Sequence, residues 1–322
     1  MTVSSATMGT RPRILLTGVS GQLGWELRRA LLPLGDLVCT AGPDDNWVGG
    51  SEVLDLSDRE AAAALVRRVA PDYVINPAAY TAVDKAEDQP ELARQINAVA
   101  PRVMAEEAAR CGAFVVHYST DYVFDGHANR PYGEHYPPSP QNVYGQTKLE
   151  GEQAVAASGA PHLILRTSWL YGPRGNNFLR TILRLARDKG ELRIVDDQTG
   201  APTWARQVAE VTAQVLAQGS ALGRAWLEDR SGTYHLTASG ATSWYGFARA
   251  ILDHAARAAP HAPLARLVPI HAVDYPAKAT RPTYSVLDCS RLASTFGLAL
   301  SPWEEQLACV MEEVNGARAE SP

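Results

Sequence analysis

The sequence contains few cysteines and no long apolar run. Its four cysteines, Cys39, Cys111, Cys289 and Cys309, lie far apart and form no C-x-x-C pair. This spacing argues against a disulfide framework or a zinc finger and favours a reduced, cytoplasmic environment. No stretch of about 18 apolar residues occurs, so we expect no membrane-spanning helix. Residues 1–12 have no apolar core of the kind found in secretion signals, and we expect a flexible N-terminal extension there.

Basic clusters and grouped histidines are also missing. The formal net charge is -5, and Lys and Arg are scattered along the chain, so nucleic acid is not an expected partner. The histidines form no H-x-x-H or H-E-x-x-H group, and His117 alternates within an apolar strand, which favours a structural role over a metal ligand. Ser119 is not part of a G-x-S-x-G motif, which argues against an acyl-transfer hydrolase.

Apolar runs alternate with helical patterns through the first half of the chain. Strand-like runs at 13–17, 37–41, 72–79 and 113–120 are separated by helical segments such as 57–70 and one near 90–110. This alternation predicts an α/β fold with a doubly wound parallel sheet. The runs VVHYS and LILRTSW are almost wholly apolar, which indicates strands in the middle of the sheet with helices on both faces.

The character of the sequence changes after about residue 170. Short strands such as 192–195, frequent prolines and a predicted helix around 203–218 follow. We therefore expect a Rossmann-like dinucleotide-binding domain over residues 13–170. Residues 171–322 are expected to form mainly a smaller α/β substrate-binding lobe, with scope for one helix to return to the first domain.

A glycine-rich loop follows the first predicted strand. The segment 17–24 reads T-G-x-x-G-x-x-G and leads into a helix. Its glycines permit a tight turn and allow the backbone to approach a pyrophosphate at the positive end of that helix. Tight packing is the alternative explanation, but a place in the first βα unit favours a dinucleotide. The predicted cofactor contacts are Gly18, Gly21, Gln22 and Leu23 in the loop, Asp55 and Leu56 near the adenine, and Ala79, Tyr80 and Thr81 near the ribose.

The second strand does not decide which nicotinamide cofactor is used. It ends at Thr40, with no acidic residue there to bind a ribose 2′-hydroxyl and no arginine to bind a 2′-phosphate. Asp44 and Asp45 follow soon after, and both also fit a solvated loop. We take NADPH as the expected cofactor and keep NADH as the alternative.

The segment 142–148 contains a Y-x-x-x-K motif. Residues four apart share one face of a helix, so the ammonium of Lys148 is expected near the phenol of Tyr144. A free phenol has a pKa of about 10, and a neighbouring cation favours its deprotonated form. Tyr144 can then donate a proton to a carbonyl oxygen as hydride reaches the carbon. Such a pair also occurs by chance on protein surfaces. Thr120, at the end of an upstream apolar strand, favours the chemical role because its hydroxyl can polarise the same carbonyl.

These motifs together resemble the extended short-chain dehydrogenase/reductases, and within them the dTDP-4-dehydrorhamnose reductase family. The similarity runs from Ile14 to about Glu305 and includes GQLGWEL, TAVDKAE, VVHYSTDYVFDG, NVYGQTKLEGE, LRTSWLYGPRGNNF, VDDQTGAPT and ATRP. It implies hydride transfer from NAD(P)H to C4 of dTDP-4-dehydro-β-L-rhamnose, which gives dTDP-β-L-rhamnose.

The resemblance also implies roles for single residues. Tyr144 would be the proton donor, Lys148 would also hold the nicotinamide ribose, and Thr120 would tune the phenol. Asp121 and Trp169 would contact the sugar, and the second lobe would bind the nucleotide.

Two further positions bear on the substrate. Arg281 is a candidate for the phosphates of the nucleotide, because a guanidinium suits bidentate phosphate contact; a surface salt bridge is the equal alternative. Related sugar-nucleotide dehydratases carry an acidic pair after the strand-end threonine. Here Asp121 is followed by Tyr122, which fits a simple ketone reduction.

A magnesium ion at a dimer contact is another implication of the resemblance. Glu26 and Glu304 match its glutamate ligands, but the third position is Arg206, where a hard cation requires oxygen. We therefore expect no metal site, activity without magnesium, and ordinary surface roles for the two glutamates. A homodimer remains an open expectation.

Two other functions remain compatible with the sequence. One is reduction of another dTDP-4-keto-6-deoxy sugar, such as a streptose or talose precursor, because the same catalytic residues would serve a differently shaped ketone. The other is a non-catalytic nucleotide-binding subunit, since this fold is also used in that way. The intact set of Thr120, Tyr144 and Lys148 argues against the second.

Overall fold

The computed structural model describes residues 11–45 and 49–319, so most of the expected N-terminal extension lies outside the described residues. Its largest element is a seven-stranded sheet in the order β11-β6-β5-β4-β1-β2-β3, in which every pairing is parallel. The strand order reverses between β1 and β4, which confirms the predicted doubly wound α/β fold. The strands are β1 (Arg13–Leu16), β2 (Asp36–Ala41), β3 (Glu52–Val53), β4 (Tyr73–Asn76), β5 (Phe114–Thr120), β6 (His162–Thr167) and β11 (Gly232–His235).

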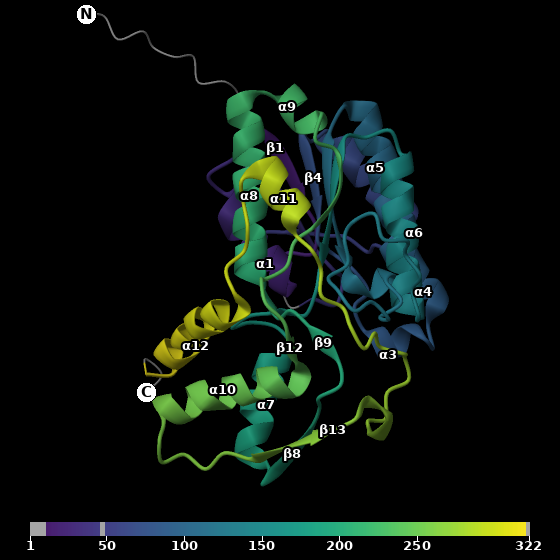
Figure 1. Cartoon of the computed structure of the whole chain (residues 1–322). Coiled ribbons are helices and arrows are strands. Elements are labelled where there is room, and N and C mark those ends of the chain that lie inside the picture. Colours follow the sequence, from purple (N-terminus) through teal and green to yellow (C-terminus); the bar gives the residue numbers. More distant parts are fainter. Residues whose placement is uncertain (1–10, 46–48, 320–322) are drawn as a thin grey trace, which may run out of the picture.

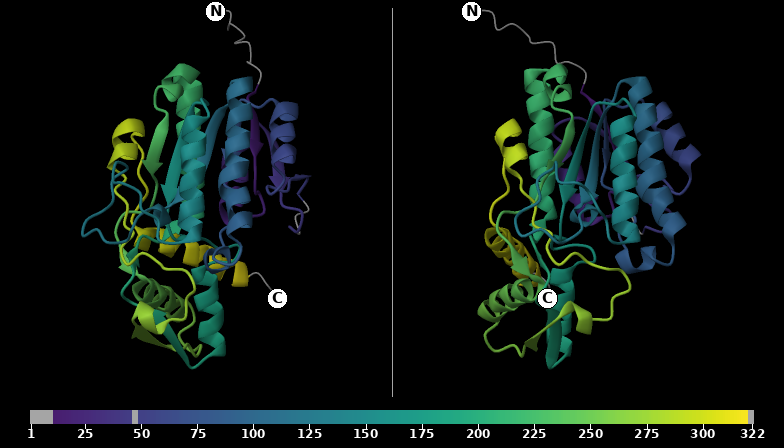
Figure 2. Two further views of the ribbon diagram at one scale, coloured as in Figure 1. Left: turned by 90° about the vertical axis from the view of Figure 1, so that its right-hand side faces the viewer. Right: turned by 45° about the vertical axis from the view of Figure 1, so that its right-hand side comes forward.

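Helices cover both faces of this sheet (Figures 1 and 2). On β1, Ile14 and Leu16 pack into one apolar cluster with α1 and α8, whereas Leu15 packs into another with α2, α5 and α6. Successive side chains of a strand point to opposite faces, so an unbroken apolar run is what a strand between two helical layers requires. The covering helices are α1 (Gln22–Leu31) and α8 (Ala205–Leu222) on one face, and α2 (Arg59–Val69), α5 (Ala100–Cys111) and α6 (Val143–Ala157) on the other.

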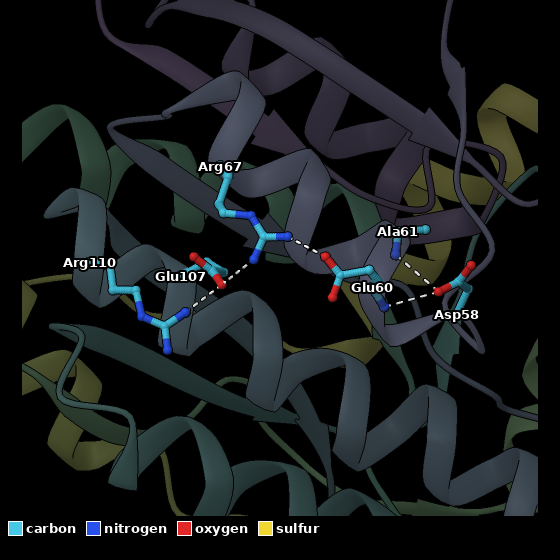
Figure 3. Close-up of polar contacts among 6 residues, drawn as sticks. All are labelled: Asp58, Glu60, Ala61, Arg67, Glu107 and Arg110. Atoms are coloured by element: carbon cyan, nitrogen blue, oxygen red, sulfur yellow. Dashed lines mark hydrogen bonds and ion pairs between the residues drawn. The ribbon is translucent and has the colours of Figure 1, made fainter.

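Polar contacts join α2 to α5 at the edge of the second layer (Figure 3). Asp58 caps α2 by accepting hydrogen bonds from the backbone N–H groups of Glu60 and Ala61, each 3.0 Å long. Arg67 of α2 pairs with Glu60 and also with Glu107 of α5, at 2.8 Å from the latter. These contacts add to the apolar packing between the two helices, which includes Leu65, Val66 and Met104.

The helix expected near 90–110 is interrupted. It consists of α4 (Pro90–Arg94), a π-helical turn (Gln95–Val99) and α5. The wider turn brings the carbonyl oxygen of Asn97 against α6, where a Cβ atom on Gly151 would lie only 2.1 Å from it. The side-chain amide of Asn97 binds the backbone of Tyr80 and the hydroxyl of Thr147. The irregular turn therefore packs closely against α6 and ties it, through Asn97, to the loop that follows β4.

The later part of the chain forms a second apolar cluster below the sheet in Figure 1. Four elements beyond residue 170 nevertheless return to the first domain, which is more than the single helix expected: β11 joins the sheet, and α8, α9 (Arg224–Glu228) and α11 (Ser290–Phe296) pack against the same face as α1. Among the described residues, none of the helices has the length and apolar character needed to cross a membrane. The other elements of the lower lobe are β7 (Leu170–Tyr171), α7 (Phe178–Asp188), β8 (Glu191–Val195), β9 (Thr199–Gly200), β10 (Thr203–Trp204), β12 (Thr242–Ser243), α10 (Trp244–Ala258), β13 (Arg266–Ile270) and α12 (Trp303–Ala319).

A buried ion pair links α6 to the sheet. The guanidinium of Arg166 on β6 donates two hydrogen bonds to the carboxylate of Glu152, at 2.9 and 2.6 Å, and each side chain is only 5% exposed. Removal of one partner from such a pair leaves an uncompensated charge in the interior.

We expect Glu152→Ala to lower the free energy of unfolding by about 3–5 kcal/mol, because Arg166 stays buried without its partner. The matched control is Glu150→Ala, two residues earlier on α6, whose pair with Arg94 is partly exposed at 45% and 27%. The free energy of unfolding of this control should fall by less than about 1 kcal/mol. Urea unfolding of the three proteins measures both values, and similar losses for the two variants would contradict the prediction.

Candidate active site

A cavity of about 660 Å³ opens at the carboxyl ends of the parallel strands. It lies where the strand order reverses, the usual ligand position in open α/β sheets. Residues that follow β1, β2, β4, β5 and β6 meet there. Of the site residues predicted from the sequence, the cavity is lined by Gly18, Gly21, Gln22, Leu23, Asp55, Leu56, Ala79, Thr81, Thr120, Asp121, Tyr144, Lys148 and Trp169.

The glycine loop forms one wall of this cavity. Gly18 has φ +58°, and a Cβ atom there would lie 2.9 Å from the Cβ of Ala78, so both conformation and space require glycine. A Cβ on Gly24 would lie 2.0 Å from the carbonyl oxygen of Gly18, which shows how tightly α1 packs on the loop. No side chain caps the start of α1. Its first N–H groups are therefore available to an anion in the cavity.

Tyr80 and Arg281 do not line this cavity. The backbone of Tyr80 binds Asn97, and its hydroxyl donates to Gln89 at 2.7 Å, so the side chain faces away from its cavity-lining neighbours. Arg281 forms an ion pair with Asp84 at 2.7 Å. It lines instead a second cavity in the lower lobe. The sequence suggested Tyr80 only because it stands between Ala79 and Thr81, and a position in the chain does not show which way a loop side chain points.

Close backbone contact positions Tyr144 beside Thr120. Asn142 caps α6 by accepting a 2.7 Å hydrogen bond from the N–H of Gly145. A Cβ on Gly145 would lie 2.2 Å from the carbonyl oxygen of Tyr122, so the start of α6 is pressed against the turn after β5. The phenol of Tyr144 thereby comes within hydrogen-bonding reach of the Thr120 hydroxyl.

Burial controls the acidity of the tyrosine. It raises the pKa of Tyr144 to about 12, and the hydrogen bond with Thr120 offsets only part of this effect. The sequence led us to expect a deprotonated form favoured by Lys148, but Lys148 is not among the groups that shift this pKa. The phenol therefore keeps its proton at neutral pH, as a proton donor must.

Lys148 is buried and held by the strand next to it. Its ammonium nitrogen donates a 2.6 Å hydrogen bond to the carbonyl of Tyr118 and lies 3.5 Å from Nε2 of His117. Burial lowers the pKa of Lys148 to about 8. His117 binds Asn76 through Nδ1 at 3.2 Å, and burial holds its pKa well below the usual value. His117 therefore has the structural position expected for it.

Two tryptophans form the outer wall. Trp169 has φ +45°, which is rare for a bulky side chain, and its ring stacks on Trp244 with centroids 3.5 Å apart. A Cβ on Gly200 would lie 2.5 Å from the Trp169 ring, so glycine is required behind it. Sequence reasoning missed Trp244, because an aromatic residue in the first turn of a helix resembles ordinary core packing.

The second cavity, of about 960 Å³, lies in the lower lobe. Its walls come from α7, β8, β13 and residues 272–281, and they include the cations Lys189, Arg193, Lys278 and Arg281. Trp244 lines both cavities. The two cavities are therefore neighbours that share this side chain as a wall.

Known proteins share this architecture. Residues 12–315 match the family model described as RmlD substrate binding domain. The chain is 43% identical to the dTDP-4-dehydrorhamnose reductase of Escherichia coli K12, and the match covers 94% of this chain and 97% of that protein. With that of Burkholderia thailandensis it shares 47% identity over 90% of this chain and 95% of the relative. The chain belongs to the dTDP-4-dehydrorhamnose reductase family.

Solved structures of the family agree. A dTDP-4-dehydrorhamnose reductase from Clostridium acetobutylicum has a TM-score of 0.83 and 37% identity, covering 94% of this chain and 99% of that one. One from Bacillus anthracis, in complex with NADP, has a TM-score of 0.83 and 33% identity, covering 94% and 100%. Membership confirms the enzyme class that the motifs predicted, an NAD(P)-dependent oxidoreductase.

Arg206 lies between two carboxylates at the side of α1. It pairs with Glu26 at 3.1 Å and with Glu313 of α12. Glu26 is only 5% exposed, so the expectation of an ordinary surface acid was wrong for it. Glu313, and not Glu304, is the second partner of Arg206. In the part of the chain that the structure describes, His, Cys, Asp and Glu form no group of three or more that could hold a metal ion.

We expect turnover to be unchanged by EDTA, because the guanidinium of Arg206 already supplies a positive charge between the two carboxylates. Initial rates of enzyme dialysed against EDTA, with and without added Mg²⁺, measure this. A loss of rate that Mg²⁺ restores would contradict the prediction.

The lowered pKa of Lys148 predicts a pH dependence of cofactor binding. Below about pH 8 the ammonium is charged and can bind the ribose and attract the anionic cofactor. Above it the charge is lost, so affinity for NADPH should fall roughly tenfold, the scale of one charged hydrogen bond. Fluorescence titration from pH 6 to 9.5 measures the affinity. Lys148→Met should bind NADPH weakly at every pH, with no fall in affinity above about pH 8. If the affinity of that variant falls in the same way, another group causes the pH dependence.

Proposed function

We propose that this protein reduces the C4 ketone of dTDP-4-dehydro-β-L-rhamnose to dTDP-β-L-rhamnose, with NADPH as reductant and Tyr144 as proton donor. The observation that carries the proposal is that Thr120, Tyr144 and Lys148 line the same cavity as the glycine loop. The family supports the identity of the sugar, because the relatives named above are reductases of that substrate.

The residues of the first cavity fit a nicotinamide dinucleotide. The glycine loop and the uncapped start of α1 suit the pyrophosphate, Asp55 and Leu56 line the end near β3, and Lys148 lies near β5 for the ribose. When bound, the cofactor supplies the hydride. The cavity side chains position its two ends along the edge of the sheet.

Asp45 bears on the choice between NADPH and NADH. It lines the cavity beside Thr40, and its carboxylate accepts hydrogen bonds from the Ser20 hydroxyl and, at 2.7 Å, from the N–H of Gly42. A carboxylate at this position suits a ribose 2′-hydroxyl and repels a 2′-phosphate. The Bacillus anthracis relative is in complex with NADP. The relative's complex supports NADPH and the Asp45 carboxylate supports NADH, and we propose that the protein uses both.

The protein side of the reaction is a single proton transfer. Tyr144 donates its proton to the ketone oxygen as that oxygen gains negative charge, and Thr120 polarises the same oxygen. The product hydroxyl keeps this proton, and the tyrosine recovers another from solvent. Lys148, one turn further along α6, does not shift the pKa of Tyr144, and its ammonium is available to the cofactor ribose.

The second lobe is proposed to hold the nucleotide. The cations of the second cavity, Arg281 among them, suit a diphosphate. The sugar would then lie near Trp244, in the first cavity, where Asp121 and Trp169 are available to its hydroxyls and ring face. This arrangement uses both cavities for one elongated ligand.

The deciding assay uses purified protein, NADPH or NADH, and a panel of dTDP-4-keto-6-deoxyhexoses. We expect oxidation of the cofactor, followed at 340 nm (the nicotinamide absorbance), with the rhamnose precursor as the best substrate. A higher kcat/KM for another sugar would favour the sister reductase, and no oxidation with any sugar would contradict the reductase function.

Tyr144→Phe is the control for this assay, because it keeps the ring and removes the proton. Its rate should be about 10²–10⁴-fold lower, the usual contribution of general acid catalysis. An unchanged rate would show that another group is the proton donor.

A further inference from the structure

Three buried polar atoms in the first cavity have no hydrogen-bond partner within the described part of the chain. They are Oγ of Ser119, Oδ2 of Asp121 and Oγ1 of Thr167. All three residues line the cavity, and they are 4%, 2% and 6% exposed. Buried polar atoms in proteins are almost always paired, so atoms left unpaired in a cavity point to a ligand that pairs them. Asp121 has a proposed role with the sugar, whereas Thr167 has none.

The position of Thr167 along the sheet identifies the part of the ligand it meets. Across the cavity the sheet runs from β3 and β2 through β1 and β4 to β5 and β6. The glycine loop follows β1, and the carbonyl that holds Lys148 lies on β5. Thr167 is the last residue of β6 and pairs in register with Thr120. It therefore lies at the end of the cavity opposite Asp55 and Leu56, which are proposed to line the adenosine, and beyond the strand that holds Lys148.

The burial of the residues at this end of the cavity indicates which of them meet the cofactor and which meet the sugar. Thr167 is buried, whereas Trp169 and Trp244, which follow it outward to the second cavity, are partly exposed. The sugar of an elongated nucleotide-linked substrate enters past Trp244, so the inner position belongs to the cofactor. A hydroxyl both donates and accepts, which matches a carboxamide; a carboxylate such as Asp121 only accepts when ionised and suits sugar hydroxyls.

We propose that the hydroxyl of Thr167 binds the carboxamide of the nicotinamide ring, with the Ser119 hydroxyl as a second partner. A carboxamide held at one edge of the cavity fixes the rotation of the ring about its bond to the ribose. Rotation decides which face of the ring meets the ketone. Thr167 is therefore a positioning residue for hydride transfer. This inference rests on the proposed use of a nicotinamide cofactor.

The test is Thr167→Val, which keeps the shape of the side chain and removes the hydroxyl. Affinities for NADPH and for 2′-phospho-ADP-ribose, which lacks the nicotinamide ring, are measured by fluorescence and by displacement. We expect the variant to bind NADPH about five- to tenfold more weakly, the scale of one hydrogen bond, and the fragment as the wild type does. Thr167→Ser, which retains the hydroxyl, should bind NADPH normally.

Thr40→Val is the matched control at the other end of the cavity, where Thr40 lies near the end of β2, lines the cavity and is 1% exposed. It should change both affinities together or neither. If Thr167→Val loses affinity equally for NADPH and for 2′-phospho-ADP-ribose, the residue has a structural role only. Unchanged NADPH affinity with a higher KM for the dTDP-sugar would assign it to the substrate. Either result overturns the inference while leaving the reductase intact, whereas a wild type that binds no nicotinamide cofactor would overturn the proposed function itself.

Discussion

The candidate active site depends on how closely α6 packs against its neighbours. At Gly145 and Gly151 the helix backbone meets the carbonyl oxygens of Tyr122 and Asn97 with no room for a Cβ. Glycine at both positions allows the helix to lie against the turn after β5 and against the π-helical turn. Tyr144 and Lys148 lie on this helix, so the same contacts that bury it carry both side chains into the cavity.

Burial has opposite effects on the two members of this pair. It disfavours the charged form of each group, so the pKa of Tyr144 rises to about 12 and that of Lys148 falls to about 8. The tyrosine consequently keeps its proton at neutral pH, as its proposed role of proton donor requires. The lysine remains charged at neutral pH but stands close to the point at which it exchanges a proton. One physical cause thus prepares both groups for a reduction.

The lower lobe contributes shape and charge to a site whose chemistry lies on the sheet. Trp244 lines both cavities and stacks on Trp169, which has a left-handed backbone conformation and whose ring fits against Gly200. Strain of this kind at a cavity wall is typical of residues kept for recognition. Trp244 is thus common to the walls of the two cavities, which is the basis for the proposal that one elongated nucleotide-linked sugar uses both.

Much of the fold and part of the site could be predicted from the sequence. Apolar runs, glycine spacing and the four-residue interval between Tyr144 and Lys148 are local properties, and local backbone geometry converts them directly into strands, a loop and a shared helix face. Four features could not be predicted in this way. They are the position of Tyr80 outside the cavity, the ion pair of Arg206 with Glu313, the place of Trp244 in the walls of both cavities, and the unpaired hydroxyl of Thr167. Each of them depends on burial and on contacts between residues far apart in the chain, which only the packed tertiary structure decides.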